Sequence, residues 1–105
     1  MSQYETKALE DFETLLGYVF ENKTHLERAL THGSYKNEMM ISVSNNECLE
    51  FLGDAVLDLV ISEVLMVRFP HTSEGALSQM RAVAVNEKKL ADVARDIHVG
   101  LYLRL

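Results

Sequence analysis

The sequence has few of the residues that define several classes of protein. It holds one cysteine, Cys48, one proline and no tryptophan in 105 residues. A single cysteine excludes a disulfide within the chain and fits a reducing compartment, so we expect a cytoplasmic protein. The polar start of the chain shows no signal peptide, which agrees with that location. Acidic residues interrupt the longest apolar run, so we expect no membrane span and no membrane partner.

Basic residues are also scarce. Ten Lys and Arg stand against sixteen Asp and Glu, which gives a formal net charge of -6. A chain that binds nucleic acid through its own charge usually carries a basic face instead. Clustered carboxylates, however, can recruit divalent cations that in turn meet phosphate, so composition leaves both interpretations open. The remaining proportions, 48% hydrophobic and 25% charged residues, are those of one soluble globular domain.

Apolar residues recur at helical spacing along most of the chain, and no hairpin signal interrupts them. The pattern predicts three helices over about residues 3–16, 23–31 and 46–69, followed by two more. Gly17 and Pro70 are placed to end the first and third helices. Ser73 and Asn86 are placed as caps for the fourth and fifth. The polar stretch 32–44 is predicted to be a loop, and the chain is predicted to be all-α.

The third predicted helix is apolar on nearly every side, which is typical of a helix enclosed by protein. Acidic residues nevertheless form one stripe along it, at spacings of three and four: Glu47, Glu50, Asp54 and Asp58. Two charges ~6 Å apart at an effective dielectric near 20 repel by about 3 kcal/mol, so a buried stripe needs a basic partner, protonation or a metal ion to offset the repulsion. No basic residue is spaced to pair with Glu50 or Asp54, and a divalent metal would serve because it prefers carboxylate oxygen. Gly53, costly within a helix, predicts that a backbone or ligand packs closely beside Asp54.

Other interpretations of these acids stay open. Glu47 lies three residues after Ser44, which is the spacing of a capping box. Asp58 fits a position that faces solvent. Glu50 and Asp54 also fit a plain solvated stripe, because two acids four residues apart are common on helices.

A longer run around the stripe carries a resemblance to a known family. The run is Asn46-Glu47-Cys48-Leu49-Glu50-Phe51-Leu52-Gly53-Asp54-Ala55-Val56-Leu57. It resembles the signature of the ribonuclease III family. Supporting matches lie on both sides of it, at residues 29–35, 69–70, 74–75, 77–78 and 80–82. The resemblance covers nearly the whole chain and is of the bacterial type.

The resemblance implies a fold and an activity. The fold is the all-α endonuclease domain of that family. The activity is that of a homodimer that cuts double-stranded RNA with Mg²⁺, leaves 5′-phosphate and 3′-hydroxyl ends, and processes ribosomal and messenger RNA precursors. Mn²⁺ is expected to substitute for Mg²⁺, and no small-molecule cofactor is implied.

The resemblance also assigns roles to individual residues. Glu50 matches a metal ligand, and Asp54 matches a catalytic acid that also holds the metal. Glu47 matches an acid near the scissile bond, and Glu74 matches an acid at the start of the next helix that contributes near the site. Phe51 matches the aromatic residue that inserts into a socket on the partner subunit.

Two departures from the family pattern leave alternatives open. Cys48 stands where the family usually has arginine. Residues 1–105 also stop before the family's second acidic motif and its double-stranded-RNA-binding domain, so we expect an incomplete endonuclease domain that is inactive alone. A non-catalytic dimerisation or RNA-scaffolding module, or a generic helical interaction domain, are the alternatives. Retention of Glu47, Glu50 and Asp54 together favours the enzyme, because a scaffold gains nothing from buried repulsion.

Overall fold

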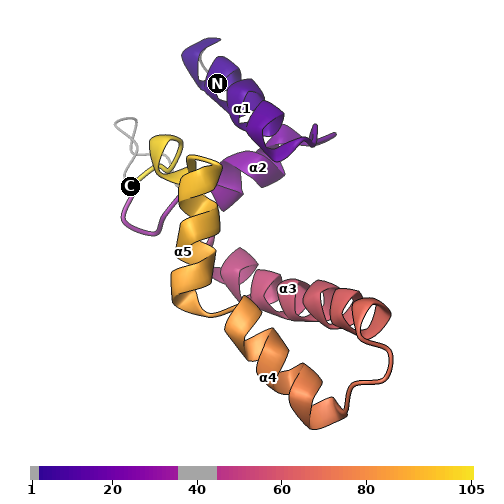
Figure 1. The fold of residues 1–105 in the computed structure, drawn as a ribbon. Helices are drawn as coiled ribbons and strands as arrows, with labels where there is room; N and C mark the ends of the chain where they lie inside the picture. Colours follow the sequence, from indigo (N-terminus) through magenta and orange to yellow (C-terminus); the bar gives the residue numbers. More distant parts are fainter. Residues whose placement is uncertain (1–2, 36–44) are drawn as a thin grey trace. The chain divides into compact units, whose positions relative to one another are not determined.

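The computed structural model describes residues 3–35 and 45–105, and within them the chain is built from α-helices (Figure 1). The elements in order are α1 (Gln3–Leu16), α2 (Lys23–Ala29), α3 (Glu47–Arg68), α4 (Glu74–Ala84), α5 (Glu87–Asp96) and a short 3-10 helix, η1 (Val99–Leu101). In these ranges the only sheet-like pairing is one isolated parallel bridge, between Thr31 and Arg104. The all-α prediction is confirmed.

Most helix ends lie where the sequence places them. Gly17 follows α1 with a φ of 73°, a left-handed conformation that glycine adopts without strain. The side chains of Ser73 and Asn86 accept backbone N–H bonds of 3.2 and 2.9 Å at the starts of α4 and α5. Helix α2 is the exception, because it ends at Ala29 and not at Thr31. Thr31 instead pairs with Arg104 in the isolated bridge.

The chain divides into two compact units. The first combines Met1–Leu49 with Ala94–Leu105, and the second is Glu50–Val93. Most of the predicted loop, and Ser44 of the predicted capping box, lie outside the described residues.

A small apolar core holds the first unit together. Its buried members are Leu9 and Phe12 from α1, Leu26 from α2 and Leu30 directly after α2. Partly buried residues pack against them: Phe20, Ile97, Val99, Tyr102 and Leu103. The rings of Phe12 and Tyr102 lie 5.1 Å apart, centroid to centroid. The apolar stripe of α1 is therefore covered in part by the C-terminal segment.

The segment after α2 is fixed by residues near the C-terminus. The Arg104 N–H donates to Leu30 O at 2.8 Å, and the His32 N–H donates to Arg104 O at 2.8 Å. The Arg104 guanidinium contacts carboxylates of Glu27 at 2.8 Å and Glu5 at 3.4 Å. These bonds connect α1, α2 and the last residues of the chain.

The second unit corrects the expectation that α3 is enclosed by protein. No residue of α3 is buried, although the helix is apolar on most sides. In Figure 1, the chain turns back after Arg68 and continues into α4. The unit holds most of α3, all of α4 and most of α5, which is too little chain to surround a long helix. Over the described residues, no helix combines the length and apolar character needed to cross a bilayer.

The buried carboxylate of Glu13 connects α1 to the loop before α2 and to the first residue of α2. Glu13 is 3% exposed, and its oxygens accept bonds from Lys23 Nζ at 2.6 and 2.7 Å and from the Phe20 N–H at 2.6 Å. These bonds lower the pKa of Glu13 below its ordinary value, with the bond from Lys23 as the main cause and burial opposing it. The charged form of Glu13 therefore stabilises the folded unit.

We expect Glu13→Gln to lower the melting temperature at neutral pH and to have little effect in acid. The pKa of Glu13 is lowered by folding, so its contribution is present above the ordinary carboxyl pKa and is lost as pH falls through the lowered value. Thermal melts between pH 7 and pH 2 measure the difference. Glu10→Gln, on the exposed side of the same helix, is the control, and an equal loss at every pH would contradict the prediction.

Candidate functional site

The acids of the signature lie on α3, and the structure leaves two of them open to solvent. Glu50 and Asp54 are four residues apart, so they lie on successive turns of one side of the helix. Both are exposed, and no salt bridge found among the described residues includes either. Asp58, one turn further along, is exposed as well, as expected for a residue that faces solvent.

This exposure removes one of the physical arguments for a metal. Like charges at this spacing on an exposed helix cost only a few tenths of a kcal/mol, roughly a tenth of the repulsion expected for a buried stripe. Gly53 also gives no support, because a Cβ built on it meets no atom within 4 Å. Among the described residues no backbone packs against Gly53, and the expected approach of a ligand stays a prediction.

The donor atoms still have the right chemistry for a hard cation. Carboxylate oxygens are the ligands that Mg²⁺ prefers, and Glu50 and Asp54 present them on adjacent turns. Across residues 3–35 and 45–105, no three His, Cys, Asp or Glu side chains are close enough together to hold a metal. The described residues therefore hold no complete ligand set for a metal, and the roles of Glu50 and Asp54 stay predictions.

Glu47 begins α3 and belongs to the first unit. Its N–H donates to the Asn45 side chain at 3.0 Å. Asn46 donates through its side chain to Ala29 O at 2.9 Å and through its N–H to Thr31 O at 2.9 Å. The start of the acidic helix is thus hydrogen-bonded to the end of α2. Two adjacent asparagines before a helix are a capping signal that sequence reasoning could have used.

Glu74 is the first residue of α4, exposed, directly after the capping residue Ser73. It lines a pocket of about 200 Å³ between α3 and α4. Arg81 lies in the same pocket and donates to Ser62 Oγ on α3 at 2.8 Å. Ser62 Oγ in turn donates to Asp58 O at 2.6 Å. Sequence reasoning missed this link between α3 and α4, because Ser62 and Arg81 form no motif.

Phe51 is 84% exposed, next to Glu50 on α3. Other apolar side chains of the same helix are exposed too, including Leu52, Leu59 and Val67. A single exposed apolar side chain needs no explanation, but a contiguous exposed apolar patch marks an interaction surface. Cys48 is also exposed and has no disulfide partner.

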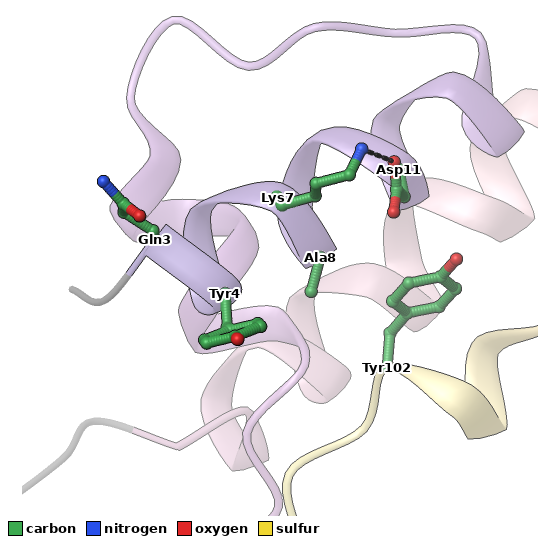
Figure 2. Close-up of a pocket in the computed structure, with 6 residues that line it drawn as sticks. All are labelled: Gln3, Tyr4, Lys7, Ala8, Asp11 and Tyr102. Carbon is green, nitrogen blue, oxygen red and sulfur yellow. Dashed lines mark hydrogen bonds and ion pairs between the residues drawn. The ribbon is translucent and has the colours of Figure 1, made fainter.

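A separate pocket in the first unit lies on α1 and holds none of these acids. It has a volume of about 590 Å³ and is lined by Gln3, Tyr4, Lys7, Ala8, Asp11 and Tyr102. In Figure 2, Tyr4 and Tyr102 lie on either side of Ala8, and Lys7 forms an ion pair of 3.3 Å with Asp11. The pocket brings together no set of residues for hydrolysis, so α3 remains the candidate site.

Comparison with known proteins gives one consistent result. The family model described as Ribonuclease-III-like matches residues 22–105. The chain is 53% identical over 97 residues to Ribonuclease 3 from Nitratiruptor sp., a match that covers 92% of the chain and 41% of that protein. It is 46% identical over 106 residues to Ribonuclease 3 from Streptococcus mutans, covering 100% of the chain and 44% of that protein.

A solved structure agrees. The nuclease domain of ribonuclease III from Campylobacter jejuni, in which a region involved in dimer formation shows structural flexibility, matches with a TM-score of 0.80 and 46% identity. The match covers 90% of this chain and 63% of that domain. The chain spans less than half the length of the two relatives named above. With its fold, its signature on α3 and these matches, the chain belongs to the ribonuclease III family.

Proposed function

We propose that the chain is part of a metal-dependent endoribonuclease that cleaves double-stranded RNA to 5′-phosphate and 3′-hydroxyl ends, in the cytoplasmic processing of ribosomal and messenger RNA precursors. One observation carries the proposal: in a member of the ribonuclease III family, Glu50 and Asp54 are both exposed on α3. Two accessible carboxylates on adjacent turns can meet a cation and a large substrate together.

The metal proposed is Mg²⁺, with Mn²⁺ as a substitute. Mg²⁺ takes six oxygen ligands and keeps several of them as water, so Glu50 and Asp54 would supply only part of its coordination. We propose that further acids come from the portion of the nuclease domain that this chain does not match. When bound, such a metal lowers the pKa of a water molecule and neutralises charge on the phosphate.

The residues of the chain then have distinct parts. Glu50 and Asp54 hold the cation, and Asp54 also takes part in catalysis. Glu47 begins α3, one turn before Glu50, and adds negative charge near the site. Glu74 lies beside Ser62 and Met66 in the C-terminal half of α3, so its part near the site stays a prediction from the resemblance. The substrate is recognised chiefly by shape, because A-form RNA presents a shallow minor groove and its 2′-hydroxyls. A net charge of -6 is compatible with RNA when cations lie between the acids and the phosphates.

Phe51 is the proposed anchor of a homodimer. An aromatic side chain that is 84% exposed loses much apolar surface when it enters a pocket on a partner. Large aromatic side chains often dominate the energy of an interface. Because Phe51 follows Glu50 directly, dimer contact and metal site would share one turn of α3.

A non-catalytic scaffold is the second candidate, and one observation favours it. In the described part of the chain, no third carboxylate, His or Cys joins Glu50 and Asp54 to complete a metal group. The exposure of both acids also removes the repulsion that would count against their retention in a scaffold. A full-length protein that binds duplex RNA and dimerises, but does not cleave with Mg²⁺ or Mn²⁺, would support this candidate.

Asp54→Asn in the full-length protein is expected to lower the rate of cleavage of a long RNA duplex by about 100-fold or more, because a ligand and catalytic acid is lost. Asp58→Asn is the matched control, since it makes the same change one turn further along α3. It is expected to leave the rate within about threefold of the parent. Cleavage by Asp54→Asn at the parental rate would show that Asp54 has no catalytic role.

Removal of divalent cations by a chelator is expected to abolish cleavage, and addition of Mg²⁺ or Mn²⁺ is expected to restore it.

With Glu50→Gln, the Mg²⁺ concentration for half-maximal rate should rise on the order of tenfold, because one carboxylate ligand is lost. Glu63→Gln, also exposed on α3, is the control and should leave that concentration unchanged. A Mg²⁺ dependence identical for Glu50→Gln and the parent would exclude Glu50 as a ligand.

Phe51→Ala in the full-length protein is expected to weaken dimerisation by about 30-fold, which corresponds to an anchor worth about 2 kcal/mol. Sedimentation equilibrium measures the dissociation constant of the dimer. Tyr4→Ala removes a similarly exposed aromatic ring from α1 and should leave the dissociation constant unchanged. Equal dimer affinity for Phe51→Ala and the parent would remove Phe51 from the interface.

A further inference from the structure

The junction between the end of α2 and the start of α3 is tightly hydrogen-bonded. Arg28 Nε donates to Asn45 O at 3.0 Å. Asn46 donates to Thr31 O and, through its side chain, to Ala29 O, each at 2.9 Å. All of these residues belong to the first unit. Two segments that are separated by fifteen or more positions in sequence are thereby fixed side by side.

The turn around Gly33 is fixed as well. The His32 N–H donates to Arg104 O at 2.8 Å, and the Tyr35 N–H donates to His32 O at 3.0 Å. Within the turn, the Ser34 N–H donates to His32 Nδ1 at 3.1 Å. The backbone on both sides of Gly33 therefore has bonds that resist displacement.

The Glu47 carboxylate lies against this turn. A Cβ built on Gly33 would stand 2.7 Å from Glu47 Oε1, which is closer than real Cβ atoms approach a neighbour. The next nearest atoms, Glu47 Cδ and Asn45 Nδ2, would be at an ordinary contact distance of 3.6 Å. The φ of Gly33 lies outside the left-handed region, so the backbone would accept alanine. Gly33 therefore matters because its lack of a side chain leaves room for the Glu47 carboxylate, and not because of its backbone conformation.

We propose that Gly33 is a positioning residue for Glu47: its missing side chain leaves the place in which the Glu47 carboxylate lies against the turn. The proposal rests on the proposed function, in which Glu47 adds negative charge near the site. The Glu47 N–H is held by Asn45, so an added methyl group at position 33 would move the carboxylate and leave the helix start in place. Such a movement costs little stability, because Glu47 Oε1 is the end of a flexible and exposed side chain.

The test is a double-mutant cycle in the full-length protein, with cleavage of duplex RNA in Mg²⁺ as the readout. We expect Gly33→Ala to lower kcat/KM on the order of tenfold, because misplacement of a group by about 1 Å has effects of this size or larger. Its melting temperature should equal that of the parent. Gly100→Ala is the control, because a Cβ there meets nothing within 4 Å and the residue lies in the same unit.

Each variant in the cycle tests whether Gly33 acts through Glu47. In a Glu47→Ala background, Gly33→Ala should have no further effect on kcat/KM, because the displaced carboxylate is absent. An undiminished loss in that background, or a lower melting temperature for Gly33→Ala, would show that Gly33 acts on something other than Glu47. Full activity of Glu47→Ala would also overturn the positioning role, whereas the proposed function as a whole is decided separately by Asp54→Asn.

Discussion

The backbone pairing of Thr31 with Arg104 is the constraint on which the first unit depends. It joins residues 73 positions apart in sequence and holds the C-terminal segment against the end of α2. The apolar residues of that segment thereby cover the core formed by α1 and α2. The same pairing fixes the turn at Gly33, and Asn46 then bonds the start of α3 to this region. A contact at the end of the chain therefore helps to place the first acid of the signature.

Local features of the fold could be predicted from sequence, and long-range ones could not. Gly17, Ser73 and Asn86 stop or cap helices through bonds to residues within four positions, so their type and spacing are sufficient signals. The Thr31–Arg104 pairing depends on residues that no periodicity connects. The apolar pattern of α3 indicates how much surface the helix can bury, but it does not indicate whether another part of this chain covers that surface.

In the candidate site, too, local features could be predicted from the sequence and long-range ones could not. The signature located Glu50, Asp54 and Phe51 on one helix, as the structure has them. The electrostatic reasoning depended on burial and failed, because the acids are exposed. Membership of the ribonuclease III family, together with accessible carboxylates, now carries the proposed chemistry. The space at Gly33 and the bond from Arg81 to Ser62 could not be foreseen, since both arise from tertiary packing.

The most direct test of the central claim is an anomalous-scattering map of full-length crystals soaked in Mn²⁺. We expect a peak within about 2.5 Å of carboxylate oxygens from both Glu50 and Asp54, because Mn²⁺ takes the same oxygen ligands as Mg²⁺. A map without a peak there, in which the two carboxylates instead pair with lysine or arginine, would contradict a metal site on α3.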